Sequence, residues 1–416
     1  MNTDSRIQKQ RKNHRALLVR IVFVLLLSFV TSFAEDIFST CRFHFGAGDQ
    51  SASGNPAIMK EVDYLTSWAG YEENFNMGNF FKHCKDNDKT PVIMAYIIAF
   101  AARRDMNLQD CNVGSPNLCQ KGANYIRERK ARILGQYAKY ATGAAQSFGT
   151  TKPMVWCMEP DYIQYADSKT QEGGGLTNKE AGAMMNEIID TILAHSPMSV
   201  FSIDISPWKD INFYKDWYGA MDMEKITFIN TSGGGSRPDQ EFICNNNASE
   251  AWSQAYVKWK SVYETFGKPI IADAGYGAGG GSTGYDGKWL DLNNLKARIP
   301  EGVVAVSYQN PTSAYSGDIA KNRSQIPTPP NCPDPPTAIS FREIQKKGPI
   351  KTGSTATGIV EIIDLSGRVV GKKPLCQIRG QWYSWQGDGK VRSNGIYTIR
   401  VSGGNQLMQK RISVIR

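Results

Sequence analysis

Carboxylate side chains follow or lie within several short apolar runs of this sequence. Glu159 and Asp273 each come just after such a run, and Asp204 lies inside another. One protonated carboxylic acid and one ionised carboxylate, facing each other across a cleft, can cleave a glycosidic bond. We expect Glu159 and Asp273 to form this pair, and Asp204 is a competing base.

Aromatic and amide side chains accompany these carboxylates along the chain. Aromatic rings can stack on sugar faces, and amides can hold hydroxyl groups. Each candidate also has a purely structural explanation, as a core aromatic residue or as a buried histidine between two phenylalanines. The candidate substrate-binding residues are His44, Trp156, Trp208, Asn230, Tyr276, Tyr308 and Gln309.

Residues 35–323 alternate short apolar runs with longer amphipathic or turn-rich stretches, which is typical of βα units around a parallel sheet. The expected strands cover residues 41–45, 91–98, 153–157, 199–205, 225–230, 269–272 and 303–308, with a weaker one near 71–76. The expected helices cover residues 56–68, 122–148, 178–195, 248–266 and 290–298, and Thr177 or Asn178 caps the third.

Eight strands over this length predict an α/β fold of the (β/α)8 barrel type, in which reacting groups lie at the carboxyl ends of the strands. Glu159 and Asp273 would then follow the fourth and seventh strands, nearly opposite each other. A doubly wound open sheet is the alternative. It is disfavoured because no G-x-G-x-x-G follows the first predicted strand.

Two segments resemble a known family. Met158-Glu159-Pro160 resembles the Asn-Glu-Pro of the large clan of (β/α)8 glycoside hydrolases that includes many cellulases and mannanases, and residues 268–276 resemble its seventh strand. The resemblance implies that Glu159 is the acid/base and that Asp273 occupies the nucleophile position. The sequence departs from the clan at Met158, where an Asn normally contacts the sugar, and at Asp273, which replaces a longer Glu.

The net charge of +9 is unevenly distributed along the 416 residues. Residues 1–34 carry six basic residues and one acidic residue, and residues 339–416 carry 14 basic and four acidic residues. The middle of the chain therefore has a net charge of −6. This acidic middle argues against a nucleic-acid-binding protein or an extracellular nuclease, which the total charge alone would suggest.

The amino-terminal segment has the layout of a secretory signal peptide. A basic stretch precedes the apolar residues 21–30, and small residues precede a predicted cleavage site after Ala34. An uncleaved anchor is the alternative, but the apolar run is shorter than the roughly 20 residues that span a bilayer. Export permits disulfides among the eight cysteines, and Cys111 and Cys119 are the best candidates. We expect no metal site, because no C-x-x-C or H-E-x-x-H pattern occurs.

The carboxyl-terminal part is a separate region. Residues 324–338 contain six prolines and predict a semi-rigid linker, and the alternating pattern of 339–416 predicts a small antiparallel β-sandwich. Residues 360–370, 393–401 and 410–415 resemble successive parts of the C-terminal sorting domain of type IX-secreted bacterial proteins. The resemblance and the basic charge imply sorting, or attachment to an anionic envelope or plant-wall surface.

Together these features predict a secreted or surface-attached glycoside hydrolase. We expect an endo-β-1,4-glucanase or mannanase that acts as a monomer on cellulose, β-glucan or mannan, without a cofactor and without binding nucleic acid. The alternative is a non-catalytic carbohydrate-binding or adhesion protein on a barrel scaffold.

Overall fold

The computed structural model divides the chain into two compact units, Met1–Asn331 and Cys332–Arg416. The predicted signal peptide, at residues 1–34, lies outside the residues that the structure describes. The described residues are 42–329, except for 112, 168, 207–208, 233, 245–256, 275–284 and 286, and the strands between residues 358 and 414.

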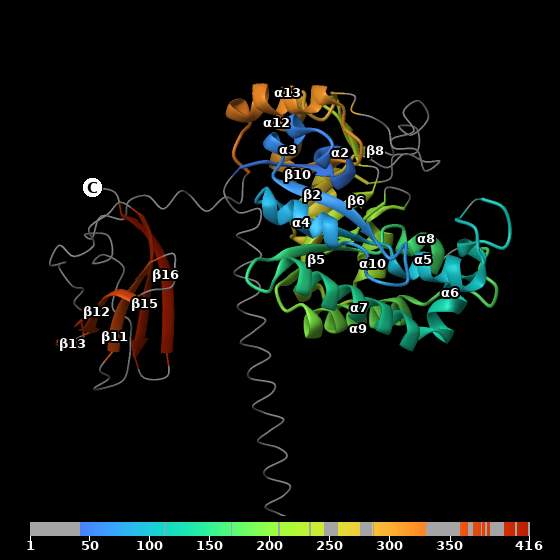
Figure 1. The fold of residues 1–416 in the computed structure, drawn as a ribbon, viewed down its shortest axis with the longest axis horizontal. Coiled ribbons are helices and arrows are strands. Elements are labelled where there is room, and N and C mark those ends of the chain that lie inside the picture. The colour runs from blue at the N-terminus through green and yellow to red at the C-terminus, as the bar shows by residue number, and fades with distance from the viewer. Residues whose placement is uncertain are drawn as a thin grey trace, which may run out of the picture. The chain divides into compact units, whose positions relative to one another are not determined.

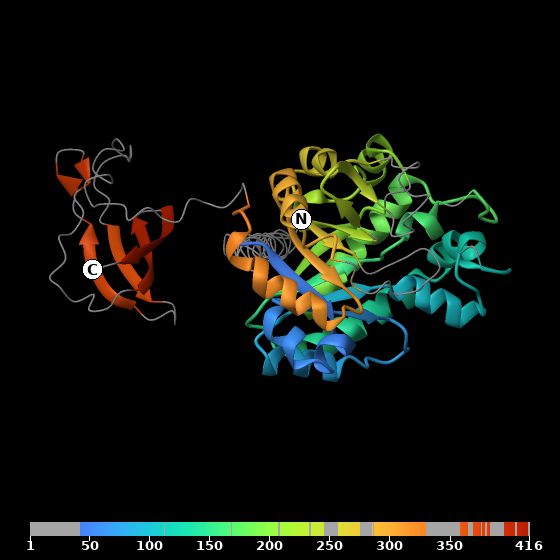
Figure 2. The ribbon, with the colours of Figure 1, turned by 90° about the horizontal axis from the view of Figure 1, so that it is seen from above.

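Eight parallel strands of the first unit close into a barrel, with helices around it (Figures 1 and 2). The order around the barrel is β1-β10-β9-β6-β5-β4-β3-β2. Closure confirms the predicted (β/α)8 fold and excludes the open doubly wound sheet. The strands are β1 (His44–Gly48), β2 (Tyr64–Ala69), β3 (Thr90–Ala95), β4 (Met154–Met158), β5 (Ser199–Asp204), β6 (Ile226–Ser232), β9 (Ile270–Asp273) and β10 (Val303–Tyr308).

Helices connect most of the successive strands, and the predicted helix 178–195 is confirmed as α9. Thr177 caps α9: its hydroxyl accepts from the N–H of Glu180, whose carboxylate accepts from the N–H of Thr177. The helices are α2 (Asp49–Ser53), α3 (Pro56–Glu61), α4 (Gly78–Asp86), α5 (Ile97–Met106), α6 (Leu118–Glu128), α7 (Lys130–Phe148), α8 (Tyr162–Ala166), α9 (Asn178–His195), α10 (Ile211–Tyr218), α11 (Trp259–Phe266), α12 (Leu292–Arg298) and α13 (Ser313–Asn322).

Buried apolar side chains form two clusters, one inside the barrel and one between the strands and the helices. Because successive strand residues point to opposite faces, every barrel strand except β1 contributes to both clusters. The inner cluster consists of Tyr64, Val92, Met94, Val155, Cys157, Val200, Phe228, Ile271 and Ala305. The cluster between the strands and the helices is called the outer cluster. An apolar strand residue in the inner cluster points into the barrel, and one in the outer cluster points toward the helices, so the directions of the polar residues next to them follow by alternation.

The second strand is not where the sequence pattern predicts it. β2 occupies the second half of the predicted helix 56–68, and the predicted strand 71–76 is a loop. The helix ends because Val62 adopts an extended backbone, with φ −78° and ψ 154°. In Tyr64–Ala69, inward-facing residues alternate with a period of two, as in a strand. A short apolar run of this kind also fits the 3.6-residue period of a helix, so the sequence pattern alone does not distinguish the two.

The first strand is also shifted, from the predicted 41–45 to His44–Gly48. Gly46 and Gly48 weaken the strand pattern in the sequence, because glycine is depleted in strands. Gly46 is required by packing: a Cβ on Gly46 would lie 2.1 Å from Cε2 of the Tyr64 ring, which fills the barrel beside it.

Two predicted helices differ in extent. The predicted helix 122–148 is two helices, α6 and α7, which meet at Arg129, a residue with φ −115° and ψ 22°. Of the predicted helix 248–266, the described part is α11, and most of the remainder lies outside the described residues.

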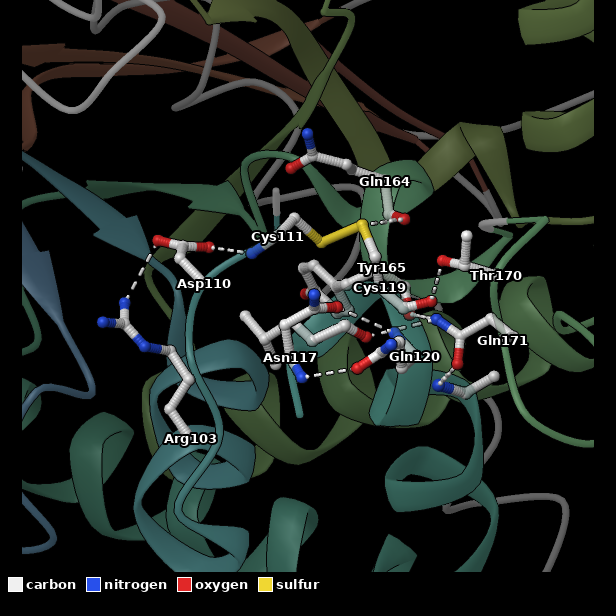
Figure 3. Close-up of a disulfide and its surroundings, with 12 residues drawn as sticks. Arg103, Asp110, Cys111, Asn117, Cys119, Gln120, Gln164, Tyr165, Thr170 and Gln171 are labelled. Atoms are coloured by element: carbon white, nitrogen blue, oxygen red, sulfur yellow. Dashed lines mark hydrogen bonds and ion pairs between the residues drawn. A yellow bond between two sulfur atoms is a disulfide. The ribbon is translucent and has the colours of Figure 1, made fainter. Parts of the chain in front are cut away.

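A disulfide closes the segment between α5 and α6. It joins Cys111 to Cys119, which confirms the predicted bridge (Figure 3). Next to it, Asp110 forms an ion pair with Arg103 of α5 at 3.2 Å. The bridge and the ion pair fasten this segment to α5 and α6.

The strands described in the second unit are antiparallel, as the sequence predicts. Four of them form a sheet in the order β12-β11-β15-β16, and two shorter ones form a hairpin. These strands are β11 (Gly358–Asp364), β12 (Val369–Leu375), β13 (Gln377–Ile378), β14 (Gln381–Trp382), β15 (Gly395–Gly403) and β16 (Gln406–Val414).

Candidate active site at the carboxyl end of the barrel

Two aspartates point into the barrel at its carboxyl end. On β5, Val200 belongs to the inner cluster and Ile203 to the outer one, so Asp204 faces inward. On β9, Ile271 is in the inner cluster, so Asp273 faces inward as well. Both side chains are buried, with exposed fractions of 4% and 1%. Each is the last residue of its strand, where a barrel presents its reacting groups.

An amide and a hydroxyl lie beside these aspartates. Asn230 of β6 pairs in register with Asp204, and Ser307 of β10 pairs with Asp273. The Ser307 hydroxyl donates to Oδ1 of Asp273 at 3.3 Å. Among the described residues, Nδ2 of buried Asn230 has no hydrogen-bond partner. Because buried amides are nearly always paired, Asn230 is a group that a ligand could satisfy.

A third aspartate, Asp161, joins this group from the loop after β4. The Ser206 hydroxyl lies 2.6 Å from Oδ2 of Asp204 and 3.2 Å from Oδ1 of Asp161. The backbone N–H of Asp161 points at the same Oδ2 of Asp204, at 3.5 Å. Asp161 has a left-handed backbone (φ 65°), which only a few non-glycine residues, chiefly Asn and Asp, adopt readily. This turn brings the two carboxyl groups together.

The close approach changes the proton affinity of Asp161. Burial, and then the charge of Asp204, raise the pKa of Asp161 to about 7, and Asp110 contributes in the same direction. A carboxyl group with this pKa is partly protonated near neutral pH. Asp161 also keeps some exposed surface, so a partly protonated carboxyl group here remains accessible. Asp161 was not among the residues predicted from the sequence, and its place two residues after Glu159 is the signal that could have identified it.

The charges of all three aspartates act on the thiol of Cys157, on the inner face of β4. Burial raises the pKa of this thiol well above its usual value, and the charges of Asp204, Asp273 and Asp161 raise it further. Carboxylates from β5, β9 and the loop after β4 thus influence the same buried group, which makes this end of the barrel a candidate for acid–base chemistry.

Glu159 lies elsewhere. Its carboxylate accepts hydrogen bonds from the N–H of Ile98 at 2.7 Å and from the hydroxyls of Tyr137 and Tyr165. These donors belong to α5, α7 and α8, outside the barrel, and Glu159 has no exposed surface. Burial raises its pKa to about 7, and the three hydrogen bonds oppose that rise. The structure does not bring Glu159 into the inward-facing group that contains Asp273.

Three of the predicted substrate-binding residues are interior residues that do not face the barrel mouth. His44 is the first residue of β1, at the opposite end of the barrel, because the strand starts later than predicted. Its Nδ1 lies 3.9 Å from Asp63. Trp156 belongs to the outer cluster and donates from Nε1 to Ser199 at 3.0 Å. Tyr308 is also in the outer cluster, with its ring packed against the ring of Tyr285.

The other predicted binding residues are Gln309, Asn230, Trp208 and Tyr276. Gln309, just after β10, donates from Nε2 to the hydroxyl of Thr66 on β2 at 2.8 Å, so it does lie at the carboxyl end. Trp208 and Tyr276 lie outside the described residues.

An aromatic group at the ends of β2 and β3 was not predicted. Trp68 of β2 is partly exposed and packs against the inner cluster. Its ring centroid lies 5.7 Å from that of Tyr96 and 6.5 Å from that of Phe100. Trp68 was not predicted because it falls at the end of the predicted helix 56–68. The inward alternation of Tyr64, Thr66 and Trp68 is the signal that could have found it.

No three His, Cys, Asp or Glu side chains in the described part of the chain are grouped so that they could bind a metal ion. Nor does any helix in that part have the length and apolar character needed to span a membrane.

Solved structures share this fold at low sequence identity. GH26C of a Muricauda species is 11% identical, with a TM-score of 0.50 over 72% of this chain and 89% of that one. A double mutant of an endo-β-1,4-mannanase from Cellulomonas fimi is 11% identical, with a TM-score of 0.47 over 93% of this chain and 97% of that one. No protein-family model matches the sequence, and no curated protein matches it either. The likeness to GH26C shows the fold alone.

Proposed function

We propose that this chain is a glycoside hydrolase that cleaves β-linked plant cell-wall polysaccharide, either mannan or a β-glucan such as cellulose. The observation that carries the proposal is that Asp204 and Asp273 face inward at the carboxyl end of a (β/α)8 barrel, with Asp161 beside Asp204. Glycosidic cleavage needs a protonated and an ionised carboxyl group at one place. The names of the mannanase and of GH26C, which share the fold, are in keeping with this proposal.

Asp273 is the proposed nucleophile or base. It is the last residue of β9, faces inward, and receives a hydrogen bond from Ser307. Its position in the sequence agrees with the nucleophile position implied by the family resemblance.

The proposed acid comes from the loop after β4, where Glu159 and Asp161 both have a pKa of about 7. We assign the role to Asp161. Both oxygens of Glu159 already accept hydrogen bonds in the helix layer, whereas Asp161 is partly exposed beside Asp204. Asp161 donates its proton to the leaving oxygen, and the negative charge of Asp204 keeps that proton in place until then.

The neighbouring polar and aromatic groups fit a sugar. Nδ2 of Asn230 is a buried donor without a protein partner in the described region, and a sugar hydroxyl would satisfy it. Trp68 offers a partly exposed ring next to the inner cluster. Flat apolar surfaces combined with a few fixed polar groups are typical of small-molecule sites.

A second candidate function is binding without turnover. The departure at Met158 and the outward position of Glu159 favour it, because both differ from what the family resemblance implies. In that case the aspartates and Trp68 would hold polysaccharide without cleaving it.

The ends of the chain suggest where the protein acts. We propose that residues 1–34 direct export and that the basic region 339–416 serves sorting or attachment to an anionic surface. Deleting residues 339–416 in the natural host is then expected to release or mislocalise the protein. Unchanged localisation of the shortened chain would contradict the proposal.

The experiment that separates the two candidate functions uses the purified wild-type chain. It is incubated with insoluble mannan, cellulose and xylan, and both bound protein and released reducing sugar are measured. Turnover of mannan or cellulose supports the hydrolase. Retention on a polysaccharide without product from any of them supports the binding protein and refutes the hydrolase.

A further inference from the structure

Tyr71 is an exposed aromatic residue at the rim of the barrel, two residues beyond β2. Its side chain is 69% exposed, the largest value among the big apolar residues of the described chain. Its ring lies edge-on to Phe100, with centroids 5.6 Å apart. Phe100 in turn contacts Tyr96 and Trp68, at 5.1 and 6.5 Å. A continuous series of rings therefore leads from the inner cluster to the surface.

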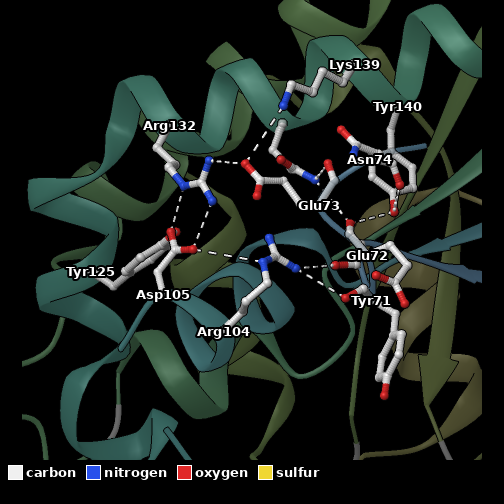
Figure 4. Close-up of polar contacts among 12 residues, drawn as sticks. Tyr71, Glu72, Glu73, Asn74, Arg104, Asp105, Tyr125, Arg132, Lys139 and Tyr140 are labelled. Carbon is white, nitrogen blue, oxygen red and sulfur yellow. Dashed lines mark hydrogen bonds and ion pairs between the residues drawn. The ribbon is translucent and has the colours of Figure 1, made fainter. Parts of the chain in front are cut away.

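The loop that carries Tyr71 is fastened by hydrogen bonds to its backbone (Figure 4). Arg104 of α5 donates to the carbonyl oxygens of Gly70 and Tyr71, at 3.3 and 3.2 Å. The Tyr140 hydroxyl of α7 donates to the carbonyl of Glu72 at 2.9 Å. The loop backbone is thus held from two helices at three successive residues.

A side-chain ion pair adds a further constraint. Arg132 of α7 contacts Glu73 at 2.8 Å and Asp105 at 2.7 Å, which links the loop to α5 and α7 at once. These pairs are partly exposed and individually weak, but they form a network. In Figure 4 the Tyr71 ring points away from these ion pairs.

The far end of the loop is fixed by packing. Phe75 lies against Gly143 of α7, where a Cβ would be 2.3 Å from the ring, and it stacks on Phe81 with centroids 6.0 Å apart. The loop is therefore ordered before any ligand arrives. A binding surface that is already ordered loses little conformational entropy when it binds.

We infer that Tyr71, with Phe100 behind it, is a stacking subsite for a sugar ring of a β-linked polysaccharide chain, outside the proposed cleavage site. The inference rests on the proposed function for its ligand class. A single exposed aromatic residue is unremarkable by itself. Here the ring is held on an ordered loop and continues the aromatic series that begins at Trp68, so a chain seated at the mouth would pass over it.

The test compares three variants with the wild type. Tyr71→Ala removes the ring, Tyr71→Phe keeps it, and Val113→Ala is a control at another exposed apolar side chain. Retention on insoluble mannan and cellulose is measured first, and kcat and KM on soluble polymer and on a disaccharide substrate second. Thermal unfolding verifies that each variant is folded.

We expect Tyr71→Ala to weaken retention and to raise the KM for polymer by about 5- to 10-fold, the effect of losing one ring contact. The KM for the disaccharide changes much less, and Tyr71→Phe and Val113→Ala resemble the wild type. If Tyr71→Ala binds polymer as the wild type does, the subsite is wrong even when hydrolysis occurs. If the wild type binds polymer through Tyr71 but releases no sugar, the hydrolase proposal fails and the subsite stands.

Discussion

The backbone N–H of Ile98 donates a 2.7 Å hydrogen bond to Oε1 of Glu159 and holds this carboxyl group in the helix layer. The hydroxyls of Tyr137 and Tyr165 complete its surroundings. Glu159 therefore links β4 to α5, α7 and α8. This arrangement explains why a residue that resembles a catalytic acid in sequence has a structural role here, and why Asp161 is the better candidate.

Replacing Glu159 tests that structural role. Glu159→Ala leaves three buried donors without an acceptor, so we expect a loss of about 3 kcal/mol or more in the free energy of unfolding. Glu159→Gln keeps one carbonyl oxygen and offers an amide to Tyr165, so its loss is about 1 kcal/mol. Urea unfolding at pH 7 measures both. Equal stability of Glu159→Ala and wild type would contradict the role.

The pH dependence of stability provides a second test. The pKa of Glu159 in the folded chain, about 7, lies above its ordinary value of 4.5. The folded state therefore favours the protonated form, and this stabilisation is complete below pH 4.5 and is lost as the pH rises through 7. Relative to Glu159→Gln, which does not titrate, the wild type should lose on the order of 3 kcal/mol between pH 4.5 and 8. Parallel stability curves for the two proteins would refute this assignment.

The pH dependence of activity tests the coupling between two aspartates. If Asp161 is the acid, kcat falls as the pH rises through about 7, because the proton is lost. Asp204→Asn removes the charge that raises the pKa of Asp161, so the fall in kcat should move to lower pH. Rates measured from pH 4 to 9 decide this. A shift to higher pH, or no shift, is incompatible with the proposed coupling.

Gly143 offers a test of the loop that carries Tyr71. In an ordinary helix position, replacing glycine by alanine stabilises by about 1 kcal/mol. Gly143→Ala should instead destabilise by about 1–3 kcal/mol and weaken retention on polysaccharide, because the new methyl group meets the Phe75 ring. Gly135→Ala is the matched control, since a Cβ there, in the same helix, has no neighbour within 4 Å. The prediction fails if both variants are stabilised alike.

The barrel was predictable from the sequence because most of its strands are short apolar runs between well-marked helices. α9, with its capping box at Thr177, is the clearest case. β1 and β2 were misplaced for two reasons: glycines interrupt β1, and the apolar run of β2 fits a helix as well as a strand. Both errors affected the site, since they placed His44 near the mouth and left Trp68 inside a helix.

The site was only partly predictable, because local sequence does not show which face a residue takes at a strand end. Asp204 and Asp273 follow the alternation of their strands and point inward, as expected at a barrel mouth. Glu159 does not follow it, since its positive φ of 42° and the donors on three helices turn it outward. Those donors come from distant parts of the chain, so only the folded structure reveals them.

The most direct measurement is the turnover number of two single variants, Asp161→Asn and Asp273→Asn, on the polysaccharide that the wild type cleaves. Both substitutions keep the size of the side chain but remove the ability to donate or accept the reacting proton. We predict that each lowers kcat by about 100- to 10,000-fold while the unfolding midpoint stays close to that of the wild type. A folded Asp273→Asn variant that retains the wild-type kcat would contradict the proposed active site.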